Sequence, residues 1–245
     1  MNFKNLSKQF WQDGYLVLDG FFDAALMQQM DRNIRRHFGK NPDFFHQEEF
    51  LSKSSTEVIP WFPQNPELPD HSRDMAIPFD ALETDERLAQ LTRAVLGENW
   101  SALYSMVMFS KKGTAGQAWH QDCPPDDAAR FNLNRLVYTR DLTDQVGGKT
   151  VVMPGSHRLG ELPAGEPHED LPGQLVLSPR RGTLVLLHGH TWHRVLPITG
   201  AFRFSTNYRA CPQDTPADIT DICVYRNMRY CFSTQSIIEE RPAQS

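Results

Sequence analysis

The residues of this chain with the clearest chemical potential are His120 and Asp122, which are separated only by Gln121. On a β-strand, side chains alternate between faces, so a histidine and a carboxylate two residues apart point the same way. A second histidine from a distant strand, His193, would complete three ligands and leave about half of an octahedral shell open. Two histidines and one carboxylate form the facial ligand set of non-haem Fe(II) oxygenases. Arg203 could then pair with the carboxylate of a co-substrate through its planar guanidinium.

A rival ligand set lies in the same part of the chain, since His188, His190 and His193 fall within six residues. Three histidines could hold zinc with a water molecule in the fourth position. On a regular strand, however, His188 and His190 share a face that His193 does not, unless a β-bulge intervenes. The zinc site would also leave His120 and Asp122 without a role. We therefore favour packing or surface roles for His188 and His190.

The composition favours a small-molecule substrate over a macromolecular partner. A net charge of -5 and a pI of about 6.0 argue against a nucleic-acid or anionic-membrane surface. No stretch approaches the ~20 apolar residues of a membrane span. The N-terminal segment lacks the basic and apolar regions of a signal peptide. The expected location is therefore the cytoplasm, and the sequence leaves the oligomeric state open.

The cysteines support the same expectation. Cys123, Cys211, Cys223 and Cys231 contain no C-x-x-C pair. In a chain of this size without a signal peptide, that pattern favours reduced thiols. Cys123 directly follows Asp122 and could lie near the site, although a small buried residue is the simpler interpretation.

The first hundred residues are predicted to form a flank of helices. Asp23 can cap a helix whose apolar residues recur at helical spacing until Gly39, namely Leu26, Met30, Ile34 and Phe38. A second helix is expected to begin at Thr84 and to end at Gly97, with Asp85 in its first turn. Both helices carry apolar residues on one side only, so we expect them to lie against a sheet.

Residues 40–80 separate these helices and are rich in proline, which excludes a regular helix and a central strand. The segment contains Trp61 and Phe62, so it could be an ordered lid over a pocket or a linker. Trp61 and Tyr138 are candidate walls of a substrate pocket, with ordinary core packing as the alternative.

From about residue 101 to about 235 the pattern changes to short β-like runs separated by glycine and proline turns. These runs are residues 103–110, 134–139, 149–153, 174–178, 183–188 and 201–208. Many short strands at this spacing predict a mainly β fold, a double-sheet, cupin-like jelly roll with the helices on its flank. We find no internal repeat, so residues 1–245 are expected to form one domain.

The last of these runs has two chemically different faces. One face carries Phe202, Phe204, Thr206 and Tyr208, and the other carries Arg203, Ser205, Asn207 and Arg209. A polar face turned to solvent is the simpler interpretation. If the aromatic face packs under the helices, however, the polar face would line the interior, which only a ligand cavity tolerates. Arg209 is accordingly either a surface charge or a second anion contact for a substrate.

Four segments of the chain, in this order, resemble the phytanoyl-CoA dioxygenase family of Fe(II)- and 2-oxoglutarate-dependent oxygenases. They are FWQDGYLVLDGFFD near the start, AWHQD, GGKTVVMPGSH, and GTLVLLHGHTWHRVLP followed by FRFSTNYR. An isolated H-x-D motif is weak evidence, because chance produces it often. Four segments at compatible spacing, covering most of the chain, are a specific signal.

The resemblance implies a double-stranded β-helix and assigns roles within it. His120, Asp122 and His193 resemble the iron ligands, and Arg203 resembles the arginine that binds the distal carboxylate of 2-oxoglutarate. The implied reaction uses O2 to convert 2-oxoglutarate to succinate and CO2 while a substrate is hydroxylated, and ascorbate is expected to stimulate it. Relatives that halogenate replace the carboxylate with a small residue, so Asp122 argues against halogenation.

Two positions near Arg203 depart from the family pattern. Many relatives place a small or hydroxyl residue two positions after the distal histidine and an asparagine about five after it. Here these positions hold Val195 and Ile198. The hydroxyl group that often supports the arginine must therefore come from elsewhere or be absent.

The expected function is hydroxylation of a small metabolite or natural-product intermediate, with desaturation or ring formation as other outcomes. Two alternatives belong to different classes. One is a non-catalytic jelly-roll binding protein, and the other is a zinc-dependent hydrolase that uses the distal histidines. The retention of all three ligands and of Arg203 favours the oxygenase.

Overall fold

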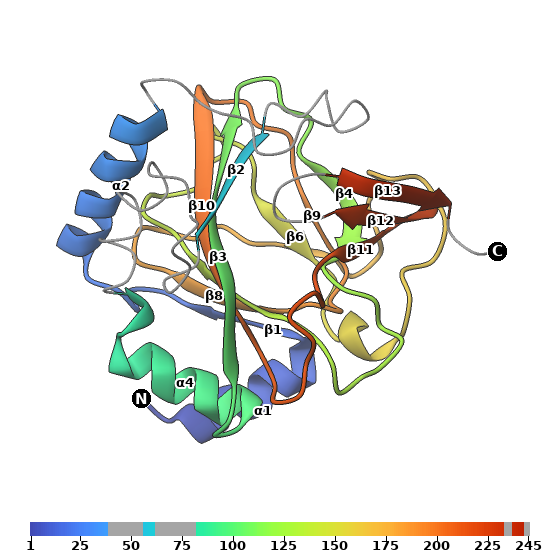
Figure 1. Ribbon diagram of the computed structural model, residues 1–245. Helices are drawn as coiled ribbons and strands as arrows, with labels where there is room; N and C mark the ends of the chain where they lie inside the picture. The colour runs from blue at the N-terminus through green and yellow to red at the C-terminus, as the bar shows by residue number, and fades with distance from the viewer. Residues whose placement is uncertain (39–55, 62–81, 233–236, 243–245) are drawn as a thin grey trace.

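The computed structural model describes residues 1–38, 56–61, 82–232 and 237–242 (Figure 1). The helices are α1 (Phe3–Asp13), α2 (Ala24–Phe38) and α4 (Glu86–Leu96), with a short 3-10 turn at Ser156–Arg158. All other described elements are strands, and every strand pair is antiparallel.

The strands form two sheets, as in a jelly roll. The first has the order β1-β8-β5-β10-β3-β2, with β1 (Tyr15–Leu18), β2 (Thr56–Trp61), β3 (Ser101–Lys111), β5 (Leu133–Val137), β8 (Leu184–His188) and β10 (Phe202–Cys211). The second has the order β13-β12-β11-β4-β9-β6-β7, with β4 (Gln117–Gln121), β6 (Thr150–Val152), β7 (Leu175–Val176), β9 (His193–Val195), β11 (Ile222–Tyr225), β12 (Met228–Phe232) and β13 (Ile237–Pro242). The predicted fold class is therefore confirmed.

Each of the six predicted β-like runs overlaps an observed strand, but the first sheet also takes strands from the expected helical flank. β1 adds to β8, and β2 adds to β3 at the edge of the sheet. Pro60 lies in β2, and an edge strand tolerates a proline because one side of its backbone needs no partner. The rest of the proline-rich segment, with Phe62, and the predicted stop at Gly39 lie outside the described residues.

Carboxylate caps define where two helices begin. Asp23 Oδ1 accepts hydrogen bonds from the backbone N–H groups of Ala25 and Leu26 at 2.8 and 3.2 Å, as predicted for α2. In α4 the cap is Asp85 rather than Thr84, because the Asp85 carboxylate accepts from the N–H groups of the first turn. The second helix thus begins slightly later than predicted. Helix α1 was missed altogether.

The helices cover the outer face of the first sheet, as Figure 1 shows for α1, α2 and α4 around β10 and β3. Phe204 and Tyr208 of β10 are buried in the core beneath these helices. The other face of β10, which carries Arg203, Asn207 and Arg209, is also buried. The prediction of a solvent-exposed polar face is therefore wrong, because helices cover one side of the strand and the second sheet covers the other.

The interior between the sheets has an apolar part of its own. Tyr138, Val185 and Leu187 from the first sheet pack with Val152 of β6 and with Leu177. The buried polar side chains of β10 occupy the rest of this inner face. A polar site is thereby placed beside an apolar wall.

The cysteines and the helices bear on two further expectations. Cys123, Cys211 and Cys223 are free and buried, as expected for reduced thiols. None of the helices within the described ranges has the length and apolar character that crossing a membrane requires.

Histidines fill the core between the end of β8 and the N-terminal helix. The ring of His188 stacks on Phe131 with centroids 3.8 Å apart, and the rings of His157 and His190 lie 5.1 and 4.9 Å from it. Burial lowers the pKa of His188 well below its ordinary value, and the neighbouring His190 and His157 lower it further. His188 therefore stays neutral in the folded protein at a pH where the unfolded chain protonates it.

We expect the free energy of unfolding to decrease as the pH falls below about 6.5, the ordinary pKa of histidine. There the unfolded chain binds a proton that folded His188 does not, which costs about 1.4 kcal/mol at pH 5.5 for a histidine that remains neutral. Urea unfolding at about pH 7 and pH 5.5 measures this loss.

The variant His188→Asn provides the matched comparison. Its side-chain oxygen can replace the Nδ1 that accepts the His190 N–H at 3.1 Å, but it does not titrate. Its stability should therefore change less with pH than that of the parent protein. An equal pH dependence in both proteins would contradict the role of His188.

Candidate metal centre

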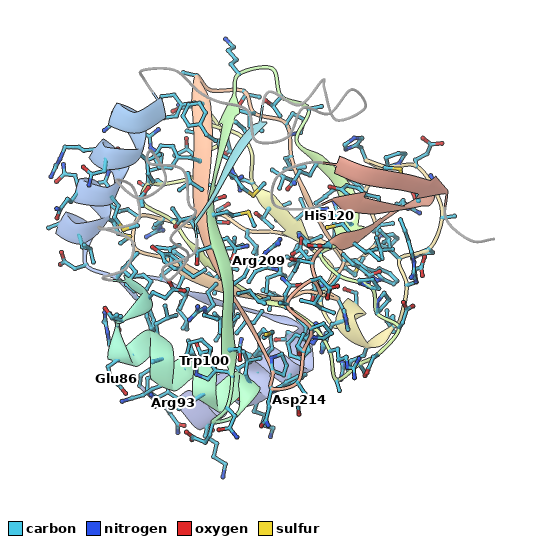
Figure 2. The ribbon with its side chains drawn as sticks, in the orientation of Figure 1. Glu86, Arg93, Trp100, His120, Arg209 and Asp214 are labelled. Carbon is cyan, nitrogen blue, oxygen red and sulfur yellow. The ribbon has the colours of Figure 1, made fainter. Side chains whose placement is uncertain are left out.

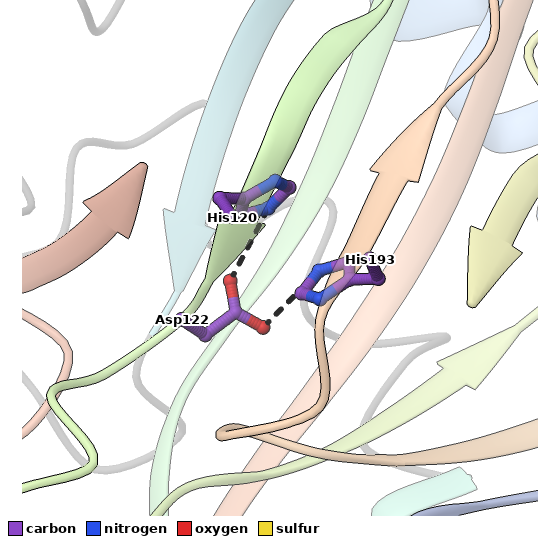
Figure 3. A group of neighbouring side chains, drawn as sticks. All are labelled: His120, Asp122 and His193. Atoms are coloured by element: carbon purple, nitrogen blue, oxygen red, sulfur yellow. Dashed lines mark ion pairs between the residues drawn. The ribbon is translucent and has the colours of Figure 1, made fainter. Parts of the chain in front are cut away.

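Three side chains predicted to act together converge between the sheets (Figure 3). His120 on β4 pairs across the strands with His193 on β9, and Asp122 follows directly after β4. Asp122 Oδ1 lies 3.8 Å from His120 Nε2, and Asp122 Oδ2 lies 3.7 Å from His193 Nε2. Within the described part of the chain, these residues form the only group of three or more potential ligands whose donor atoms all lie within 4.8 Å of one another.

Backbone carbonyls orient both imidazole rings. Nδ1 of His120 lies 2.8 Å from the carbonyl oxygen of Ala118, and Nδ1 of His193 lies 2.9 Å from that of Thr191. A carbonyl oxygen only accepts hydrogen bonds, so each Nδ1 carries a hydrogen, and in the neutral form of each ring Nε2 keeps its lone pair. Both Nε2 atoms are therefore in the form that a metal requires.

The charges of the group also suit a cation. Burial, with the neighbouring His193, lowers the pKa of His120 to about 3, although Asp122 opposes the shift. Burial by itself would raise the pKa of Asp122, but His193 and Arg209 outweigh it and lower the value to about 2. At neutral pH the group therefore offers a neutral His120 and an ionised Asp122 without first releasing protons from them.

A close backbone approach sets the position of Asp122. Its N–H donates to the carbonyl oxygen of Gly189 at 2.8 Å. A Cβ atom on Gly189 would lie 2.1 Å from Asn132 Oδ1 and 2.8 Å from Cys123 Sγ, so a larger residue would displace these buried side chains. The glycine of the loop after β8 thus allows the two sheets to approach at the site.

Gln121 points away from this group, as the period of a strand predicts. Its Nε2 donates to the carbonyl oxygens of Gly160 and His190 at 3.1 and 2.9 Å, and its Oε1 accepts from the Leu162 N–H at 2.8 Å. Gln121 therefore ties the ligand strand to two loops behind it.

The rival histidine set does not form. His188 and His190 are buried, and the His190 N–H donates to His188 Nδ1 at 3.1 Å. His193 instead lies beside His120, with ring centroids 4.1 Å apart. Among the described residues no metal-binding group contains His188 or His190, so the zinc-site alternative loses its geometric basis and their packing role is confirmed.

Arg203 is buried on the inner face of β10, and its Nε has no hydrogen-bond partner among the described residues. Burial lowers the pKa of the Arg203 guanidinium, and the nearby Tyr138 opposes that shift. The Tyr138 hydroxyl also lies 3.4 Å from Thr150 Oγ1. Tyr138 thus places near Arg203 a hydroxyl group that Val195 and Ile198 do not supply.

A glycine turn packs against the same arginine. Gly148 has a φ of +64°, and a Cβ atom there would lie 3.0 Å from Arg203 Cγ and 3.1 Å from its Cδ. The GG pair of the GGKTVVMPGSH segment therefore meets two requirements, a left-handed backbone and close contact with the arginine stem.

The other two predicted substrate contacts are Arg209 and Trp61. Arg209 is buried, with Nη2 3.4 Å from Asp122 Oδ1, so the surface-charge interpretation is wrong. Figure 2 labels Arg209, on β10 of the first sheet, and His120, on β4 of the second. Trp61 is the last residue of β2, and its side chain lies outside the described part of the structure.

Sequence comparison identifies the family. The family model described as phytanoyl-CoA dioxygenase matches residues 10–204. The chain belongs to the phytanoyl-CoA dioxygenase family. A curated relative, dioxygenase hkm4 of Aspergillus hancockii, is 23% identical over 202 residues, which cover 75% of this chain and 62% of hkm4. The chain thus spans less than two thirds of the length of that relative.

Solved structures of similar fold include metal- and 2-oxoglutarate-bound proteins. The epimerase SnoN from nogalamycin biosynthesis, in complex with Fe3+, alpha ketoglutarate and nogalamycin RO, has a TM-score of 0.65 at 17% identity and covers 99% of this chain and 96% of its own. HygX from Streptomyces hygroscopicus with nickel, 2-oxoglutarate and hygromycin B has a TM-score of 0.62 at 17% identity and covers 86% and 87%. At such identities the likeness concerns the fold.

We expect the native protein to bind one equivalent of Co(II) or Ni(II) and Asp122→Ala to bind it more than about 100-fold more weakly. Loss of a hydrogen bond that supports a ligand already costs about 10- to 100-fold, and loss of the ligand itself should cost more. Isothermal titration calorimetry measures both affinities. The control is Asp144→Ala, which removes an exposed carboxylate paired with Lys149. Equal affinities of the two variants would contradict the assignment.

Proposed function

We propose that the protein is an Fe(II)- and 2-oxoglutarate-dependent oxygenase that hydroxylates a small molecule. The observation that carries the proposal is the convergence of His120, Asp122 and His193 with lone pairs and charge suited to a divalent cation. Family membership supports the same reaction class. The zinc hydrolase has no ligand set among the described residues, and the non-catalytic binding protein remains an outcome of the test.

The residues present fit both the metal and the co-substrate. Two imidazoles and one carboxylate suit Fe(II) and leave coordination positions for other ligands. The buried Arg203, whose Nε lacks a partner among the described residues, is the group that a carboxylate of 2-oxoglutarate would satisfy. Bound Fe(II) supplies the activation of O2 that oxidises 2-oxoglutarate to succinate and CO2.

The protein's own residues then position the reactants. His120, Asp122 and His193 hold the metal on the second-sheet side of the interior. Arg203, supported by Tyr138 and by the Gly148 turn, fixes the co-substrate from the first sheet. The apolar wall of the interior excludes water from the reacting groups.

Hydroxylation is the proposed outcome because Asp122 occupies the carboxylate position, with desaturation or ring closure decided by substrate placement to within about 1 Å. The proposed substrate is a small metabolite or natural-product intermediate. The structures of HygX with hygromycin B and of SnoN with nogalamycin RO support that class. Trp61 remains a proposed substrate contact. We also propose that residues 1–245 form one domain, that the protein lies in the cytoplasm and that ascorbate stimulates the reaction.

We expect the purified protein with Fe(II), ascorbate and 2-oxoglutarate to produce succinate, slowly without substrate and faster with a substrate from a metabolite panel. Asp122→Ala should abolish this turnover, because it removes a ligand, whereas Asp144→Ala should retain it. Succinate release and the mass of the oxidised product are the measurements. Turnover unchanged in Asp122→Ala, or ligand binding by the native protein without any succinate, would overturn the proposal.

Tyr138→Phe should raise the apparent KM for 2-oxoglutarate about 2- to 10-fold if the hydroxyl contributes one hydrogen bond of roughly 0.5–1.5 kcal/mol to the Arg203 site. The kcat should change little, since the proposed role of Tyr138 is to support Arg203. Tyr208→Phe is the matched control, because Tyr208 is buried on the opposite side of the same sheet. A KM equal to that of the native protein would show that Tyr138 does not support Arg203.

A further inference from the structure

Asp122 is held far more completely than the two histidines beside it. Its N–H donates to Gly189, its carbonyl oxygen accepts from Cys223 Sγ at 3.5 Å, and Oδ1 lies 3.4 Å from Arg209 Nη2. The shortest contact is to Oδ2, which accepts a hydrogen bond from Asn134 Nδ2 at 2.6 Å. The backbone N–H, the backbone carbonyl and both carboxylate oxygens of Asp122 therefore each have a protein partner.

The orientation of the Asn134 amide follows from its other contacts. Its Oδ1 accepts hydrogen bonds from three donors, which are Asn132 Nδ2 at 3.1 Å, Asn207 Nδ2 at 2.7 Å and Arg209 Nε at 3.2 Å. A reversed amide would set its NH2 group against these donors and its oxygen against the carboxylate. Only the observed orientation satisfies all of them, so the NH2 group must face Asp122.

Asn134 also links the two sheets at the site. It lies on β5 of the first sheet and is 1% exposed, whereas Asp122 follows β4 of the second sheet. In a buried environment a hydrogen bond to a charged group is strong, and an unmade one is costly. A rotation of the Asp122 carboxylate would break the Asn134 bond and the Arg209 contact together.

We propose that Asn134 is a positioning residue that locks the Asp122 carboxylate in its metal-binding orientation, with Arg209 as its support. The inference rests on the metal site of the proposed function. Asn134 supplies the donor without adding a charge beside the cation, and Arg209 holds the oxygen end of the amide while contacting Asp122 Oδ1. Outer hydrogen-bond partners of this kind typically affect metal affinity 10- to 100-fold.

The test uses Co(II) as the probe, because its visible absorption reports the geometry of its ligands. Asn134→Ser replaces the amide with a hydroxyl that ends one bond short of both amide atoms, so it cannot donate to Asp122 as Nδ2 does. We expect Co(II) to bind about 10- to 100-fold more weakly, with a changed visible spectrum. Asn134→Thr, which suits a β-strand better, should show the same loss and guards against a folding defect in the serine variant.

The matched control is Thr206→Val. Thr206 is fully buried on β10 and donates to the Val137 carbonyl oxygen at 2.9 Å, on the face of the strand away from the site. Thr206→Val therefore removes a buried hydrogen bond from the same sheet without touching Asn134 or Asp122. Urea unfolding ranks the stabilities, and Co(II) affinity and spectrum should remain native in this control even when its stability falls.

Two results would overturn the inference. One is native Co(II) affinity and spectrum in both Asn134 variants, and the other is an equal loss in Thr206→Val at equal stability. These results are separable from failure of the proposed function, in which the native protein itself would produce no succinate or would bind Co(II) independently of Asp122. Native metal binding that depends on Asp122 but not on Asn134 would sink this inference alone.

Discussion

The polar face of β10 is buried between two sheets, and most features of the site follow from that constraint. Arg203, Asn207 and Arg209 lie there at 4, 4 and 5% exposure, where an unpaired charge or amide would be costly. The positive charge of Arg209 is paired with the Asp122 carboxylate, and the Asn207 amide donates a hydrogen bond to Asn134. Asp122, the carboxylate of the candidate metal centre, is thus also a counter-ion for the opposite sheet. Fold stability and ligand geometry depend on the same contacts.

Backbone groups complete what the side chains begin. Carbonyl oxygens of Ala118 and Thr191 fix the hydrogen on each histidine ring, which leaves Nε2 free. A Cβ atom at Gly189 would displace buried side chains, and one at Gly148 would press on the Arg203 stem. These positions contribute no chemistry of their own. They allow the chain to approach closely enough for the functional side chains to meet.

Patterns that depend on near neighbours were predictable from the sequence. The six β-like runs, the Asp23 cap and the grouping of His120 with Asp122 rest on local periodicity and capping. Helix α1, strands β1 and β2 and the true cap at Asp85 were missed or misplaced. For β1 and β2, pairing with distant strands decides the structure, and a short run carries no sign of its partner.

The sequence by itself determined the ligand types, their order and the presence of an arginine at a family position. Only the tertiary structure decided which histidines lie together. His188 ends β8, whereas His193 begins β9 after a turn and lies with His120 and Asp122. The tertiary structure likewise decided that Tyr138 lies near Arg203 and that Asn134 donates a hydrogen bond to Asp122. Such contacts join different strands across the interior, and residue spacing along one chain does not encode distances between sheets.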